Sequence, residues 1–198
     1  MENSDHIVVD ATGHVAGKLA GKIAKLLLNG VKVSVVCAEN ALLMRTMEMA
    51  KADFKEYLNK RCIVNPRRGP FHYREPKMHL AKIIRRMISY KKWRGKTALT
   101  RLSVHEGIPA EFENCKRHKF AKSMYYYNSK PHKNVSLGDL LSEFGWKHGE
   151  QVKKLTERVR ERESLEVLRK EETEKRCKEI KETKDFSEEL KRRMAMFA

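Results

Sequence analysis

The residues best suited to chemistry lie in a segment where arginines alternate with aromatic rings, Arg67-Arg-Gly-Pro-Phe-His-Tyr-Arg74. A guanidinium group binds phosphate oxygens through two parallel hydrogen bonds and also stacks on flat rings, which a lysine ammonium does not do. Aromatic rings stack on unpaired nucleobases. Gly69 would let the backbone approach a phosphate closely. The pattern predicts nucleic-acid binding at this segment.

The chain continues the same chemistry beyond this segment. A helix predicted over about 77–89 places Lys82, Arg85 and Arg86 largely opposite its apolar positions, and a basic turn, Lys91-Lys-Trp-Arg-Gly-Lys96, follows it. Phe71 and Tyr73 have two interpretations, since their rings either stack on bases or belong to the core. The predicted nucleic-acid-binding residues are Arg67, Arg68, Gly69, Phe71, His72, Tyr73, Arg74, Lys82, Arg85, Arg86, Lys91, Lys92, Arg94 and Lys96.

The charge of the chain is concentrated around these residues. Residues 60–101 contain fourteen Lys and Arg and one acid, Glu75, so they hold +13 of the net charge of +17. Such a density repels itself unless a polyanion neutralises it, and a phosphate backbone fits that requirement. Residues 1–59 contain seven bases and seven acids, which predicts a scaffold rather than a second binding site.

Enzymatic chemistry finds little support. Asp10 with His14, or His105 with Glu106, would be imaginable acid–base pairs. Neither pair comes with a nucleophile held by an orienting third group, which hydrolytic catalysis requires. We therefore expect no catalytic residue.

A glycine-rich turn, Gly13 to Lys18, invites comparison with nucleotide-binding loops. A phosphate loop needs four residues between its glycines and a Ser or Thr after the lysine. Here three residues intervene and Leu19 follows the lysine. Spacing by four in Gly13, Gly17 and Gly21 instead predicts a small-residue face packed on a sheet. A nucleotide-dependent enzyme remains a rival hypothesis, tested by thermal stabilisation with ATP or NAD.

Metal and disulfide chemistry are not expected either. His72 and His79 are seven residues apart across Pro76, which is unsuited to a pair of helical metal ligands. The four cysteines form no CxxC pair, so reduced thiols are the simplest interpretation. We expect no metal, no cofactor and no small-molecule substrate.

These residues need elements to position them. Residues 6–10 and 31–37 are apolar runs typical of buried strands, and the apolar positions of 14–28 recur at helical spacing before Asn29-Gly30. Strand, helix and strand within about thirty residues predict a parallel pair with a right-handed crossover.

The rest of the body extends this unit. We expect a helix over about 41–59, a brief apolar segment at 62–64, a loop at 65–70 and a fourth strand at 102–105. The predicted fold class is α/β: a three-layer α/β/α body with a small, mostly parallel four-stranded sheet and a long C-terminal helical extension. After Pro109 the pattern is irregular, and whether Tyr125 to Tyr127 stack on RNA or pack internally stays open. A short helix is expected to begin after Ser136 as its N-cap.

The C-terminal part is distinct in composition. Residues from about 150 to 184 are rich in Glu, Lys and Arg, which predicts a long exposed helix supported by ion pairs four residues apart. An extension that orders on a partner and a coiled coil are both compatible with it. We place the body at 1–150 and the extension at 151–198. No segment predicts a signal peptide or a membrane span, so a soluble intracellular protein is expected.

Three segments carry a family resemblance. They are Asp10-Ala-Thr-Gly-His-Val-Ala-Gly-Lys-Leu-Ala20, Asn65-Pro-Arg-Arg-Gly-Pro-Phe-His-Tyr-Arg74 and Arg94-Gly-Lys-Thr-Ala-Leu-Thr-Arg-Leu102, with Gly107-Ile-Pro109 after them. Over about residues 6–150 the chain resembles the large-subunit ribosomal protein thirteen family, in its archaeal and eukaryotic branch. Its charged tail resembles the extension of eukaryotic members.

The resemblance implies a structural protein of the large ribosomal subunit that binds ribosomal RNA, supports assembly and catalyses nothing. It makes Arg67, Arg68, Gly69, Arg74 and Arg94 RNA-facing, and Lys91 and Lys92 fall where members are also basic. Expected partners are large-subunit ribosomal RNA and neighbouring ribosomal proteins, the latter through 110–198. Expected locations are cytoplasmic ribosomes and, in a eukaryote, transiently the nucleolus. The alternative is a free regulatory RNA- or protein-binding module acting through the C-terminal helix.

Overall fold

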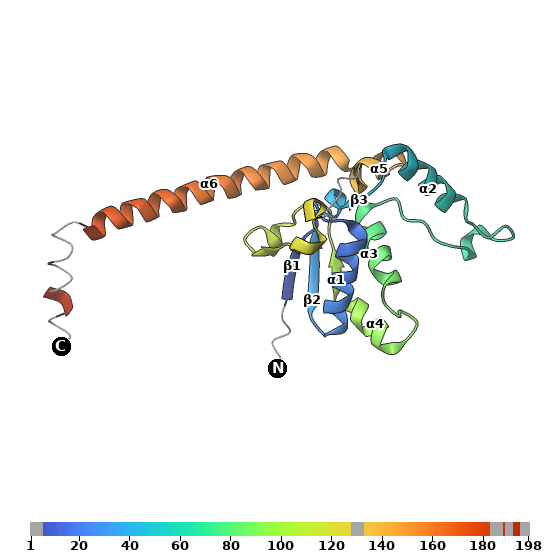
Figure 1. Ribbon diagram of the computed structural model, residues 1–198, viewed down its shortest axis with the longest axis horizontal. Helices are drawn as coiled ribbons and strands as arrows, with labels where there is room; N and C mark the ends of the chain where they lie inside the picture. Colours follow the sequence, from blue (N-terminus) through green and yellow to red (C-terminus); the bar gives the residue numbers. More distant parts are fainter. Residues whose placement is uncertain (1–5, 128–132, 183–187, 189–191, 195–198) are drawn as a thin grey trace. The chain divides into compact units, whose positions relative to one another are not determined.

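The computed structural model describes residues 6–127, 133–182, 188 and 192–194. The chain divides into two compact units, residues 1–156 and residues 157–198. The first unit contains the sheet and the helices that surround it, and the second unit consists of the C-terminal helical extension (Figure 1).

A four-stranded parallel sheet forms the centre of the first unit. Its strands, in spatial order, are β4 (Leu102–Val104), β2 (Lys32–Val36), β1 (His6–Asp10) and β5 (Arg117–His118). Strands β1 and β2 pair from His6 opposite Lys32 to Asp10 opposite Val36. Val9, Val33 and Val35 are fully buried, as expected for strands covered on their faces. The predicted α/β class with a small parallel sheet is confirmed.

Three helices cover one face of this sheet: α1 (Ala16–Leu28), α3 (Pro76–Arg86) and α4 (Trp93–Thr100). Helix α1 packs against both others, and α1 and α3 run side by side in Figure 1. Leu19, Ile23 and Leu27 of α1 are buried with Leu80 and Ile84 of α3 in one core cluster. Strand β1, helix α1 and strand β2 therefore form the predicted unit, and Gly30 ends α1 with a φ of +98°.

The opposite face is covered differently. Val8 and Val36 point to that face and pack with Phe112, which lies in a single 3-10 turn, Ala110–Phe112. Gly107, which precedes this turn along the chain, has a φ of +64°, in the left-handed region that favours glycine. Short turns and loops, rather than long helices, contact the sheet here.

A smaller cluster lies beside the sheet. Helix α2 (Met47–Asn59), helix α5 (Leu137–Glu143) and the antiparallel pair of β3 (Leu42–Leu43) and β6 (Val135–Ser136) surround it. Phe54, Leu141 and Trp146 are buried in this second core. Ser136 caps α5 as predicted, since its hydroxyl accepts the N–H of Asp139 at 3.0 Å.

One predicted helix boundary was wrong, and the apolar segment at 62–64 does not join the sheet. The helix expected from residue 41 begins at Met47, because Leu42 and Leu43 pair with β6 and Thr46 caps the helix. The apolar segment 62–64 forms no strand, since Ile63 and Val64 are both 95 % exposed. Strand β5 takes the fourth place in the sheet instead, beside β1.

The predicted packing role of the glycines in α1 was also wrong. Gly17 and Gly21 lie on the exposed side of the helix, away from the sheet. A Cβ atom added to Gly17 would have no neighbour within 4 Å, and one added to Gly21 would only touch the Met87 sulfur at 3.7 Å. Ala16, Leu19, Ala20, Ile23 and Ala24 make the buried contacts instead.

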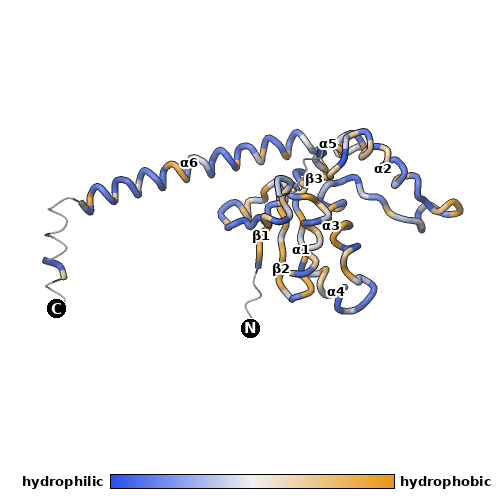
Figure 2. The backbone as a smooth tube through the Cα atoms, in the orientation of Figure 1, coloured by the Kyte–Doolittle hydropathy of each residue, from blue (hydrophilic) through white to orange (hydrophobic). Residues whose placement is uncertain are grey.

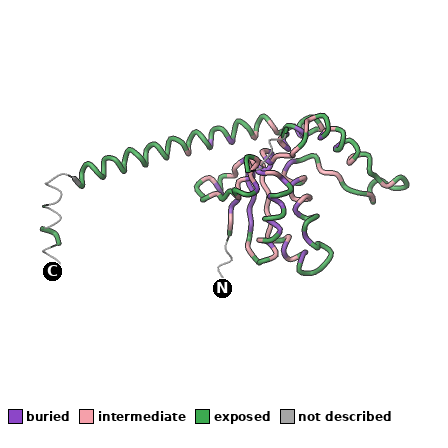
Figure 3. The backbone as a smooth tube through the Cα atoms, viewed as in Figure 1, coloured by how far each residue is buried: buried purple, intermediate pink, exposed green. Residues whose placement is uncertain are grey.

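Helix α6 (Gly149–Glu182) confirms the predicted long C-terminal helix. Its course is mainly hydrophilic in Figure 2 and mainly exposed in Figure 3. Leu165, Val167 and Leu168 are each more than half exposed. None of the helices in the described part of the chain has the length and apolar character needed to span a membrane.

Candidate nucleic-acid interface

The arginine-rich segment lies in a loop, residues 60–75, that connects α2 to α3 and is mainly exposed in Figure 3. A single 3-10 turn, Pro66–Arg68, shapes its tip. The side chain of Asn65 accepts the N–H of Arg67 at 3.1 Å, and the N–H of Gly69 donates to the carbonyl of Pro66 at 3.3 Å. Arg67 and Arg68 are thus exposed on an ordered turn.

Gly69 is where the two arms of this loop meet. A Cβ atom built at this position would lie 2.5 Å from the backbone nitrogen of Cys62 and 2.8 Å from the Cys62 Cβ. Any larger residue would push the arms apart. The glycine therefore closes the loop, a role independent of any approach by a ligand.

Lys82 of α3 holds the base of the loop. Its ammonium group donates to the Tyr57 hydroxyl at 2.6 Å and to the carbonyl oxygen of Phe71. The same nitrogen lies 4.8 Å from the ring centroid of Tyr57 and 5.5 Å from that of Tyr73, distances typical of cation–π contacts. We call Lys82, Tyr57 and the Phe71 carbonyl the loop clamp.

His72 strengthens the loop clamp from the other arm. Its Nε2 lies 2.7 Å from the carbonyl oxygen of Lys60, and its ring meets Tyr57 edge to face with centroids 4.2 Å apart. Phe71 is 62 % exposed, so its ring is not part of the core. Tyr73 is half-buried beside Lys82, so it combines internal packing with partial exposure.

Helix α3 carries the next cations at its C-terminal end. Arg85 and Arg86 are exposed in the last turn, where positive charge also favours the helix dipole. The Arg85 guanidinium lies 4.6 Å from the ring centroid of Tyr90. That contact orients the guanidinium while leaving it at the surface.

The basic turn predicted at 91–96 is divided between a turn and a helix. Lys91 and Lys92 are exposed in the turn, and Lys92 is the N-cap of α4, on which Arg94 and Lys96 are exposed. Gly95 faces the carbonyl oxygen of Ser89 so closely that a Cβ atom would overlap it. This contact fixes the turn relative to α4.

The structure sorts the fourteen predicted residues into two groups. Gly69, His72, Tyr73 and Lys82 are half-buried, Gly69 next to the loop tip and the other three at the loop base. The remaining ten are exposed and define what we call the cationic surface: Arg67, Arg68, Phe71, Arg74, Arg85, Arg86, Lys91, Lys92, Arg94 and Lys96.

Two further residues of the candidate interface were not predicted from the sequence. Tyr57 anchors the loop clamp, although nothing in the pattern of α2 distinguishes it from a helix-face residue. Trp93 is 82 % exposed between Lys92 and Arg94, which gives the cationic surface a second large ring. The basic residues Lys92 and Arg94 on either side of Trp93 were the sequence signal that could have identified it as part of the surface.

The histidines and acids considered for catalysis have structural roles. His14 is buried, and its Nε2 accepts the N–H of Phe120 at 2.9 Å; burial lowers the pKa of this ring. The Glu106 carboxylate accepts the Lys77 N–H at 3.3 Å and the Trp146 indole N–H at 3.2 Å. Within the described residues, no cluster of three or more His, Cys, Asp or Glu has a metal-binding arrangement.

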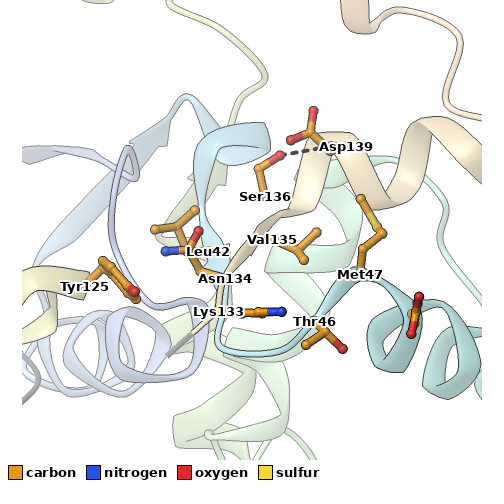
Figure 4. Close-up of a pocket in the computed structure, with 10 residues that line it drawn as sticks. Leu42, Thr46, Met47, Tyr125, Lys133, Asn134, Val135, Ser136 and Asp139 are labelled. Carbon is orange, nitrogen blue, oxygen red and sulfur yellow. Dashed lines mark hydrogen bonds between the residues drawn. The ribbon is translucent and has the colours of Figure 1, made fainter. Parts of the chain in front are cut away.

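Figure 4 shows a cavity of about 790 Å³ whose lining includes no residue of the cationic surface. It opens between the start of α2 and the segment 133–136 that leads into α5. Its polar lining mixes Lys133 with Glu48 and Asp139, and Ser136 uses its hydroxyl on the Asp139 N–H. This lining lacks a nucleophile with a partnered base, so the cavity offers no catalytic arrangement.

Comparisons with known proteins show the family of the chain. The family model described as "Ribosomal protein L13" matches residues 4–111. A relative from Spodoptera frugiperda, "Large ribosomal subunit protein uL13", is 40 % identical over 192 residues, covering 96 % of this chain and 91 % of the relative. A protein of the same name from Drosophila melanogaster is 40 % identical over 150 residues, covering 75 % and 73 %. The chain therefore belongs to the ribosomal protein L13 family, as its three sequence segments predicted.

Proposed function

We propose that this protein is a structural constituent of the large ribosomal subunit and that its cationic surface binds ribosomal RNA. The observation that carries the proposal is the surface itself: nine exposed Lys and Arg side chains and Phe71 on ordered backbone, in a stretch with a single acid. Both relatives bear the name of a large-subunit protein. Membership in a ribosomal protein family agrees with the expectation that the chain is not an enzyme.

The proposed mechanism is positional. Arg67 and Arg68 on the loop tip and Arg85 and Arg86 on α3 neutralise phosphates of RNA strands that approach one another. The exposed rings of Phe71 and Trp93 offer stacking surfaces for unpaired bases. The loop clamp keeps these groups in a fixed arrangement. Contact with about six to eight phosphates would lower affinity by roughly three to four decades between 50 and 200 mM salt.

The partner and location follow from this role. We propose that segments within 110–198 contact neighbouring large-subunit proteins, because residues 157–182 contain nine acids and nine bases and so have little attraction for phosphate. The protein would reside in cytoplasmic ribosomes and, in a eukaryote, pass through the nucleolus during assembly.

Charge reversal of Arg67, Arg68 and Arg74 to Glu tests the proposal. Binding of the full chain to deproteinised large-subunit RNA, measured across a salt series, should weaken at least about tenfold and lose about three units of salt slope. The matched control reverses three exposed lysines of α6, Lys170, Lys175 and Lys178, and should bind nearly as the unaltered protein does. Unchanged binding by the arginine variant would overturn the proposal.

Sedimentation separates this role from the alternative of a free regulatory module. The exposed apolar side chains of α6, such as Leu165 and Leu168, are the feature that favours the alternative. A constituent of the large subunit should sediment with large subunits in a sucrose gradient. A protein found in the free fractions alone would support the module instead.

A further inference from the structure

The exposed face of α1 forms a second basic strip. Gly17, Lys18, Gly21, Lys22 and Lys25 are all exposed and follow one line along the helix, while the helix contains no acidic residue. The zero net charge of residues 1–59 conceals this strip, because their seven acids all lie outside the helix. Three of the seven basic residues in 1–59, namely Lys18, Lys22 and Lys25, lie on one face of α1.

This strip adjoins the cationic surface. Helix α1 packs against α3 and α4, and Gly21 lies beside Met87, the residue that follows Arg86. At the other end of α1, the Arg101 guanidinium donates to the carbonyl of Leu27 at 2.8 Å. The helix layer over this face of the sheet thus presents bases from α1, α3 and α4, which between them contain no acid.

We propose that the α1 strip, led by Lys22 and Lys25, binds the phosphate backbone of the same RNA and extends the cationic surface across the helix layer. The occupant is RNA rather than protein because the strip is purely cationic and continuous with the proposed interface, and α1 itself contributes no exposed apolar side chain to it. The partly exposed Met87 beside Gly21 is a single apolar side chain among bases. The two exposed glycines leave the helix backbone uncovered between the lysines, so a phosphate group has room to approach them. This inference rests on the proposed function.

The first experiment replaces lysines by glutamine, which keeps good helix propensity at exposed positions. Because Lys18 also makes a contact within the chain, K22Q/K25Q is measured beside K18Q/K22Q/K25Q. With deproteinised large-subunit RNA, we expect the salt slope to fall by about two and about three units, and affinity at 150 mM salt to fall several-fold or more. The control, K170Q/K175Q/K178Q in α6, removes the same charge and should leave the slope unchanged.

A second readout locates the contact directly. An amine-reactive acetylating reagent should modify Lys22 and Lys25 in the free protein and spare them in the RNA complex, while Lys170 and Lys175 react in both. Unprotected Lys22 and Lys25 with an unchanged slope would overturn the inference, even if charge reversal of Arg67, Arg68 and Arg74 abolishes binding. Unchanged binding by both sets of variants would instead refute the proposed function itself.

Discussion

Glycines in this protein serve opposite physical purposes. At Gly69 and Gly95 the backbone of another segment, from Cys62 and from Ser89, occupies the space that a side chain would need. At Gly17 that space is empty. A glycine destabilises an exposed helix relative to alanine by about 0.5–1 kcal/mol in the interior and by less near the ends. Gly17, in the first turn of α1, therefore weakens the helix slightly without helping the packing of the body.

Alanine substitutions should therefore change the free energy of unfolding in opposite directions. Gly17→Ala should raise it by up to about 0.5 kcal/mol, because the new methyl group meets no neighbour and the residue lies in the first turn of α1. Gly69→Ala and Gly95→Ala should lower it by about 1–3 kcal/mol, because the loop arms or the turn must move. Urea denaturation measures all three, and wild-type stability in Gly69→Ala would contradict the close contact with Cys62.

At the scale of elements, His79 joins α3 to α2. Its ring centroid lies 5.8 Å from that of Phe54 and 6.2 Å from that of Tyr57. Burial lowers the pKa of His79, and the charges of Lys82 and Arg86 lower it further. The ring is neutral where the two helices meet, so protonation opposes their packing.

Stability should consequently fall as the solution becomes mildly acidic. In the unfolded chain the pKa of His79 is about 6.5, so below that pH the unfolded state binds more protons than the folded state. The stabilisation is complete above about pH 6.5 and is lost as the pH falls towards the depressed pKa. Urea denaturation at pH 7.5 and 5.5 should show this loss, and His79→Gln should reduce the difference. A difference that persists undiminished in His79→Gln would assign it to other groups, such as buried His14.

The secondary-structure elements also show which parts of the fold can be predicted from the sequence and why. Strand β1, helix α1 and strand β2 were predicted because their apolar spacing is local and unambiguous. Strand β5, Arg117–His118, has no apolar run and exists only because β1 offers it an open edge. Ile63 and Val64 resemble a strand by composition but have no partner strand to pair with among the described residues.

The candidate site likewise has a part that the sequence predicted and a part that it did not. Charge density and alternating rings were enough to predict the exposed arginines, because such side chains need no partner within the chain. The sequence could not predict the loop clamp, since Lys82 and Tyr57 are 25 positions apart and their contact depends on how α2 and α3 pack. Sequence alone therefore treated Lys82 as an RNA ligand, whereas the structure gives its ammonium group internal partners.

At the scale of the whole molecule, the two units differ in what stabilises them. The first unit has a core of fully buried Leu, Ile and Val side chains around the sheet. In the second unit, Val159 of α6 is buried, but the apolar residues beyond it, Leu165, Val167, Leu168 and Ile180, are more than half exposed. Local opening of that helix therefore exposes little new apolar surface and should require little free energy.

Hydrogen exchange of backbone amides should show this difference. Amides of β1, β2 and α1 should exchange only with global unfolding, because their hydrogen bonds lie in the core. Amides over 165–182 should exchange orders of magnitude faster in the isolated protein, and slow down when a partner covers the helix. Equal protection of both parts in the isolated protein would show that α6 is stabilised by contacts not described above.

The loop clamp has a consequence for how the protein meets RNA. Fixing the backbone of one free residue requires about 1–2 kcal/mol of conformational entropy, and a loop that orders only on binding loses that amount from its affinity. Residues 60–75 are held beforehand by Tyr57, His72 and Lys82, so that entropy is lost during folding rather than during association. Under the proposed function, the RNA would be the more flexible partner: its strands would adapt to a preformed template, and the protein could act on RNA that has not yet reached its final shape.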